Sequence, residues 1–65
     1  MTKQEAIQSM EEGYKVTHEY FTDEEWMKLR NGVYIFEDGV KCTPNEFWKH
    51  RQAEWYNEGW SIYEE

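Results

Sequence analysis

The stretch from Val33 to Trp48 constrains the fold more than any other part of the chain, because it joins two β-type segments, a turn and a helix start. Asp38-Gly39 predicts a type I′ hairpin turn, since both central positions of that turn need positive φ angles. Thr43 is a typical helix N-cap, Pro44 suits the first helical position, and Glu46 completes a capping box. The sequence therefore predicts a β-hairpin that leads directly into a helix.

The other segments predict a single domain of the α+β class over residues 1–65, in the order α-β-α-β-β-α-β. Helical periodicity and capping pairs predict a helix over 1–13, a short helix over 22–30 and a third helix over 44–58. Alternation predicts strands over 14–20 and 60–63, which add to the central hairpin in a small antiparallel sheet. We expect the helices to cover one face of this sheet. The other face should then show Tyr34, Phe36 and Tyr63.

Aromatic residues dominate the supply of apolar side chains. The chain of 65 residues has four Trp, five Tyr and three Phe, and a domain of this size cannot bury so many rings completely. The core should therefore be largely aromatic, and some rings should remain exposed. An exposed aromatic cluster indicates a ligand, a partner or a homo-oligomer.

The charge is strongly acidic, with a net charge of −7 at pH 7. This balance argues against direct binding to nucleic acid or to an anionic membrane, and it permits a basic partner. No 18-residue apolar run and no signal pattern are present, and Cys42 is the only cysteine. We therefore expect a protein of the cytoplasm, in a reducing compartment, with no membrane segment.

Two arginines interrupt the apolar helical pattern. Arg30 falls beside Trp26, and Arg51 falls among the rings of the third helix. A guanidinium next to aromatic faces can stack on a base and bind a phosphate. Alternatively, each arginine lays its alkyl stem on a ring and pairs with an acid at the rim of the core. The candidate ligand-binding residues are Tyr34, Phe36, Trp48, Arg30, Arg51 and Trp55.

No pattern in the chain predicts catalysis, a cofactor or a metal. His18 and His50 have no metal-ligand spacing, and Cys42 has no histidine partner evident in sequence. The acids from Asp23 to Glu25 are explained by the first turn of a helix. Phosphate loops and nucleophile motifs are missing. We therefore do not expect an enzyme, and we interpret these side chains as structural.

The two ends of the chain resemble a family of small bacteriophage proteins. The matching segments are Glu5-Ala6-Ile7, Met10-Glu11-Glu12-Gly13-Tyr14-Lys15-Val16 and Asn57-Glu58-Gly59-Trp60-Ser61-Ile62. They are similar to the opening and the ending of the Thoeris anti-defence family, phage proteins that sequester nucleotide-derived immune signals. Residues 17–20 depart from the Arg and Trp usual in that family, and the middle of the chain has no counterpart. The resemblance therefore implies a class of function and no particular binding residue.

These observations support three hypotheses. In the first, a homo-oligomeric phage protein binds a small nucleotide-derived immune signal in the host cytoplasm without cleaving it. In the second, the acidic surface mimics DNA and inhibits a host defence protein, as anti-CRISPR or anti-restriction proteins do. In the third, the aromatic residues serve self-association only. We expect any pocket to lie between the hairpin and the third helix, or that helix of a second copy.

Overall fold

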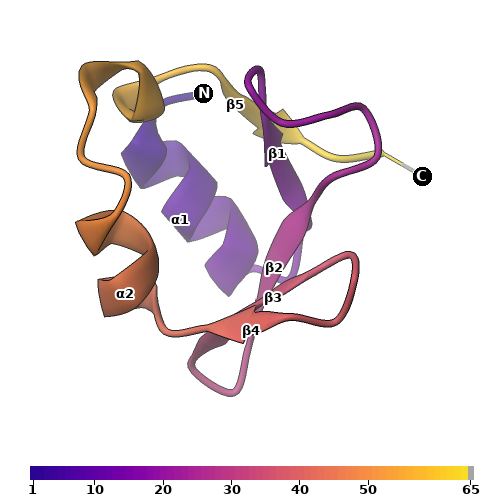
Figure 1. The fold of residues 1–65 in the computed structure, drawn as a ribbon. Coiled ribbons are helices and arrows are strands. Elements are labelled where there is room, and N and C mark those ends of the chain that lie inside the picture. Colours follow the sequence, from indigo (N-terminus) through magenta and orange to yellow (C-terminus); the bar gives the residue numbers. More distant parts are fainter. Residues whose placement is uncertain (65) are drawn as a thin grey trace.

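The computed structural model describes residues 1–64 and confirms the α+β class (Figure 1). The elements are α1 (Lys3–Glu11), β1 (Val16–His18), β2 (Met27–Arg30), β3 (Val33–Phe36), β4 (Lys41–Cys42), α2 (Pro44–Lys49), a 3-10 helix η1 (Glu54–Asn57) and β5 (Trp60–Ile62). The strands form one antiparallel sheet in the order β4-β3-β2-β1-β5. Figure 1 shows α1 and α2 on the same side of the strands, as expected.

The two α-helices, α1 and α2, begin at the predicted N-cap residues. The Thr2 hydroxyl accepts a hydrogen bond from the Glu5 backbone N–H at 3.2 Å, and the Glu5 carboxylate accepts one from the Thr2 N–H at 2.9 Å. These bonds stabilise the carboxylate and hold the pKa of Glu5 below its ordinary value. At α2, the Thr43 hydroxyl accepts from the Glu46 N–H at 3.3 Å, and Pro44 is the first helical residue. Local capping chemistry therefore sets where both helices start.

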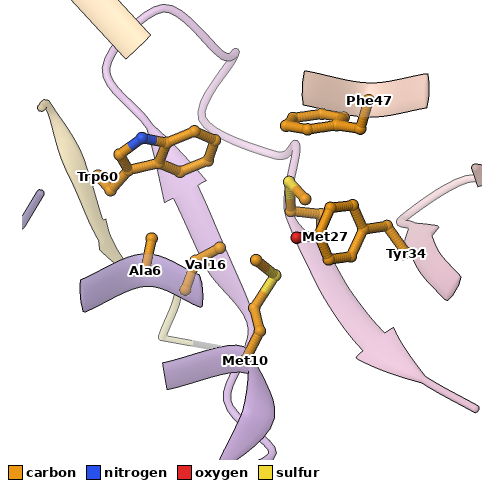
Figure 2. Close-up of a cluster of buried hydrophobic side chains, with 7 residues drawn as sticks. All are labelled: Ala6, Met10, Val16, Met27, Tyr34, Phe47 and Trp60. Carbon is orange, nitrogen blue, oxygen red and sulfur yellow. The ribbon is translucent and has the colours of Figure 1, made fainter. Parts of the chain in front are cut away.

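The hydrophobic core lies between the helices and one face of the sheet. Ala6 and Met10 reach it from α1, and Phe47 reaches it from α2. Figure 2 shows these side chains directed at the buried residues of the strands. The strand residues of the core are Val16, Met27, Tyr34 and Trp60. The core is therefore as rich in aromatic rings as the composition predicts.

The predicted helix over residues 22–30 is wrong. Only its first turn forms, where the Thr22 N–H donates to the Glu25 carboxylate at 2.9 Å and the Glu25 N–H donates to the Thr22 carbonyl at 3.1 Å. The chain then enters β2, which pairs with β3 from Met27↔Phe36 to Arg30↔Val33. Asn31 (φ 54) and Gly32 (φ 80) are the two-residue turn between them. Sheet pairing has overridden the helical tendency of this segment.

The turn at Asp38-Gly39 also differs from the expected type I′ turn. Gly39 has φ 87, but Asn31 is the one non-glycine residue of the described chain with a positive φ angle. The Gly39 N–H donates to the Phe36 carbonyl, and the Phe36 N–H donates to the Val40 carbonyl, both at 2.9 Å. This pattern is typical of a three-residue loop with a left-handed glycine. The hairpin that it closes lies at the sheet edge, because β4 is the outer strand.

The sheet face that we expected to be open is the buried one. Tyr34 is only 3% exposed, and Phe36 packs against the core beside it. Val33 and Ile35 therefore point to the uncovered face, because successive side chains of a strand alternate. The register explains this orientation, since Tyr34 pairs with Cys42 and Phe36 pairs with Met27, which is fully buried.

The predicted third helix is much shorter than expected, because His18 binds the segment that follows α2. His18 is 2% exposed, and its Nε2 lies 2.9 Å from the Trp55 carbonyl oxygen and 2.7 Å from that of Glu58. Its Nδ1 accepts a hydrogen bond from the Tyr20 N–H at 3.1 Å, so the ring proton is on Nε2 and donates to the carbonyls. In a continuous helix the Trp55 carbonyl would instead accept from the N–H of residue 59. The chain therefore leaves α2 and wraps around the imidazole.

Replacement of Gly59 by alanine should destabilise the protein strongly. Gly59 has φ +85, and an added Cβ would lie 2.9 Å from Glu19 Cδ and 3.1 Å from His18 Nε2. We expect Gly59→Ala to lower the free energy of unfolding, measured by urea denaturation, by about 2–3 kcal/mol. Gly13→Ala is the matched control, because Gly13 has φ +99 but nothing within 4 Å of the added atom. The decrease in the free energy of unfolding should be about 1 kcal/mol smaller for Gly13→Ala than for Gly59→Ala. Equal decreases in the two variants would contradict the role of the close approach to His18.

Candidate functional site

Four of the six predicted ligand-binding residues come together, but in the core. Tyr34, Phe36, Trp48 and Arg51 all contact the buried ring of Phe47 on α2. The ring centroids of Tyr34 and Trp48 lie 5.4 Å and 4.7 Å from that of Phe47, and both pairs are edge-to-face. Figure 2 shows the rings of Tyr34 and Phe47 on either side of the Met27 side chain. The space that we expected to be a pocket between hairpin and helix is filled by these side chains.

A hydrogen bond joins the two walls of that expected pocket. The Trp48 indole N–H donates to the Tyr34 hydroxyl at 2.9 Å. Burial raises the pKa of Tyr34, because the phenolate would lose its hydration, and the bond from Trp48 opposes this rise. The pair therefore fastens β3 to α2 with its polar atoms satisfied.

Arg51 fits the alternative interpretation more closely than the ligand-binding one. Its guanidinium carbon lies 4.3 Å from the centroid of the Phe47 ring, and its Nε is buried without a hydrogen-bond partner within residues 1–64. Lys3 makes a similar contact from α1, with its Nζ 4.4 Å from the Trp48 ring centroid. Both cations lie on aromatic faces of the core and help to cover them.

The remaining two predicted residues lie outside this cluster. Trp55 is 54% exposed on η1, and its ring lies 6.1 Å from that of Tyr20, which is 62% exposed. Arg30 is exposed at the end of β2. The structure therefore does not unite the six residues in one site, and their role in binding stays a prediction.

Arg30 instead belongs to a basic surface on the uncovered face of the sheet. Alternation from the buried positions places Lys28 and Arg30 of β2 and Lys41 of β4 on this face. Ile35 separates two of these bases, because it pairs with Lys28 on one side and with Lys41 on the other. We call Lys28, Arg30 and Lys41, with Lys15 beside them, the basic face.

Trp26 lies next to the basic face. The Nζ atoms of Lys15 and Lys28 lie 4.3 Å and 5.7 Å from the centroid of its ring, and the ring of Tyr63 lies 6.3 Å away. The residue is half-buried and is not part of the core cluster. An aromatic ring and several cations are therefore close together on the open side of the sheet.

A hollow of about 420 Å³ opens beside the basic face and is lined by Arg30, Asn31, Val33, Ile35 and Lys41. Its volume lies within the range of small-ligand pockets. Val33 and Ile35 give it an apolar lining and Arg30 and Lys41 give it two cations, so it suits an anionic ligand with some apolar surface.

The charge of the protein is divided between surfaces. The basic face holds four of the chain's seven Lys and Arg residues. No described outward position of the five strands is acidic, since these positions are Thr17, Lys28, Arg30, Val33, Ile35, Lys41 and Ser61. Within residues 1–64, Lys28, Arg30 and Lys41 form no ion pair with a carboxylate. Neighbouring like charges on one sheet face destabilise each other, and a bound anion relieves that repulsion.

The histidines and the cysteine were weighed as reactive groups in the sequence. His18 is committed to three backbone groups, His50 is exposed at the end of α2, and the Cys42 thiol donates to the Thr43 carbonyl at 3.4 Å. Within residues 1–64 no three His, Cys, Asp or Glu side chains could together hold a metal ion.

The sequence analysis missed Trp26 and Lys28 because it interpreted residues 22–30 as a helix. Asn31-Gly32 was the signal that could have found them, because this dipeptide between two alternating segments is typical of a two-residue hairpin. With β2 and β3 paired, Lys28 and Arg30 fall on the same face as Ile35.

Comparisons with known proteins give no relative, since no family model, no curated protein and no solved structure matches the chain. No helix within residues 1–64 has the length and apolar character needed to cross a membrane.

Tyr34→Phe should change the response of stability to alkaline pH. The folded-state pKa of Tyr34 is raised above its ordinary value of 10.0, so stability is full below that pH and is lost as pH rises through the folded-state value. Because the variant lacks the hydrogen bond from Trp48, its free energy of unfolding at neutral pH should be about 1 kcal/mol lower than that of wild type. Its free energy of unfolding should then fall less than that of wild type as the pH is raised. Urea denaturation across pH 8–11 measures both effects. Tyr14→Phe changes a half-exposed ring and should leave the pH dependence of the free energy of unfolding as in wild type. If Tyr34→Phe also kept the wild-type pH dependence, the contribution of Tyr34 to it would be contradicted.

Proposed function

We propose that this protein binds a small phosphate-bearing nucleotide ligand on the basic face of its sheet and sequesters it without cleaving it. The observation that carries this proposal is the hollow between Arg30 and Lys41 on a face that holds no acidic strand residue. Arginine and lysine donate charge-assisted hydrogen bonds to phosphate oxygens, and arginine can do so through two parallel bonds. Val33 and Ile35 provide an apolar floor for the remainder of the ligand.

The acidic character of the whole chain is compatible with this site because the positive charge is concentrated locally. A second hollow of about 270 Å³ includes Glu19 and Asp23 in its lining, and carboxylates repel phosphates. The basic face is therefore the favoured position for an anion. Since exposed charges are screened by salt, the binding constant should fall as ionic strength rises.

Sequestration needs affinity and no catalytic group. Among the described residues, the hollow beside Arg30 is lined by no carboxylate, imidazole or thiol that could act as a general acid, general base or nucleophile. The resemblance of the chain ends to the Thoeris anti-defence family supports a setting for this activity. In that setting, a phage protein in the host cytoplasm removes a nucleotide-derived immune signal.

Loss of the two cations that line the hollow should weaken binding strongly. Calorimetric titration of the wild-type protein with cyclic dinucleotides and cyclic ADP-ribose products should give saturable binding to at least one compound. Arg30→Gln combined with Lys41→Gln should weaken it by roughly a hundredfold, because each charge-assisted bond contributes about 1.5 kcal/mol or more. Lys49→Gln is the matched control, since Lys49 is exposed on α2. This variant should bind the compound as tightly as wild type does. No heat from any compound, or equal loss in the control, would overturn the proposal.

The exposed pair Tyr20 and Trp55 favours a second function, self-association. Their rings lie 6.1 Å apart at the surface, and adjacent exposed aromatic rings are enriched at protein interfaces. We expect Trp55→Ser to shift the protein from oligomer to monomer in size-exclusion chromatography with light scattering. A wild-type protein that is monomeric at the highest soluble concentration would exclude this function without affecting the first.

A further inference from the structure

Three side chains on the open side of β2 form a line. Trp26 directly precedes the strand, and Lys28 and Arg30 follow at intervals of two residues on its uncovered face. Because a strand advances about 3.3 Å per residue, successive members are roughly 7 Å apart and the whole line is about 13 Å long. An aromatic ring therefore begins a line that continues with two cations toward the hollow.

The chain holds Trp26 in place from several sides. The Thr22–Glu25 turn before it is closed by two hydrogen bonds, and the Thr17 hydroxyl donates to the Glu25 carbonyl at 2.8 Å. Tyr63 flanks the ring at 6.3 Å. The ring is nonetheless outside the core cluster. It is thus positioned without being needed to fill the interior, and a fixed ring loses little entropy when it binds.

The contacts of Trp26 are ones that a ligand can replace. Two ammonium groups, those of Lys15 and Lys28, lie within 5.7 Å of its centroid, and cation–π contacts at exposed sites are weak. A nucleobase that stacks on the ring would displace an ammonium group, and that group could then donate to a phosphate of the same ligand.

We propose that Trp26 is the base-stacking platform of the site and that the ligand is a nucleotide with at least two phosphates, lying along β2. Its base stacks on Trp26, its first phosphate meets Lys28, and its second reaches Arg30 and Lys41. A nucleotide with one phosphate reaches Lys28 and stops short of the hollow. This inference rests on the proposed function, since it extends the same anion site to a second position.

Three simple compounds separate the two positions: ADP, AMP and pyrophosphate. Every base has a face that can stack, so adenine is a suitable probe. We expect calorimetry to show ADP binding at least tenfold more tightly than AMP, which lacks the second phosphate, and than pyrophosphate, which lacks the base. Trp26→Leu should reduce ADP affinity to that of pyrophosphate and leave pyrophosphate binding unchanged. Trp26→Phe, which keeps an aromatic ring, should retain most of the wild-type affinity for ADP.

Tyr14→Leu is the control variant, because it removes a half-exposed ring outside the site, and this variant should bind all three compounds as wild type does. Thermal unfolding checks that each variant is folded. If Trp26→Leu binds ADP as wild type does while pyrophosphate binding still depends on Arg30 and Lys41, the stacking platform is overturned and the anion site survives. If wild type binds neither ADP nor pyrophosphate, the anion site and this inference both fail.

Discussion

The hydrogen bonds of His18 attach the segment that follows α2 to β1. The imidazole binds the carbonyls of Trp55 and Glu58 and the N–H of Tyr20. It also packs against the rings of Tyr56 and Trp60, with centroids 4.9 Å and 4.8 Å away. A buried polar group costs free energy unless it is fully paired. The geometry satisfies both ring nitrogens, so the buried histidine fixes one path for the segment between α2 and β5.

That path determines which face of the sheet is covered. With residues 55–60 held against β1, the indole of Trp60 lies over the core face, and its Nε1 donates to the Tyr56 carbonyl at 2.8 Å. The two helices and Trp60 complete one apolar layer, and nothing within residues 1–64 covers the other face of β2 and β3. The concentration of lysine and arginine there follows from the same division, since the long alkyl stems of these residues can lie over the half-buried side chains of Val33 and Ile35.

The sequence predicted the features that depend on neighbouring residues and missed those that depend on distant ones. The Thr2 and Thr43 caps were predictable because each cap is completed within four residues. The end of α2 was not predictable, because the carbonyl of Trp55 is bound by His18, which lies 37 residues earlier in the sequence. The orientation of β3 was ambiguous, since both of its faces carry apolar side chains, and only pairing with Met27 and Cys42 decides it. Arg30 was found as a candidate for its chemistry, but its companions Lys28 and Lys41 become visible only with the sheet register.

The pairing of β5 with β1 has a consequence for how the chain acquires its structure. Strands β1 to β4 are joined by local turns, whereas Val16 pairs with Ile62 across most of the chain. The largest fully buried side chain, Trp60, is carried by β5. Since contacts between distant residues form slowly, the meander can assemble early but its core closes only when β5 arrives. During synthesis on the ribosome, the protein therefore stays incompletely packed until residues 60–62 have emerged, and its exposed core face is then open to chaperones or to premature association.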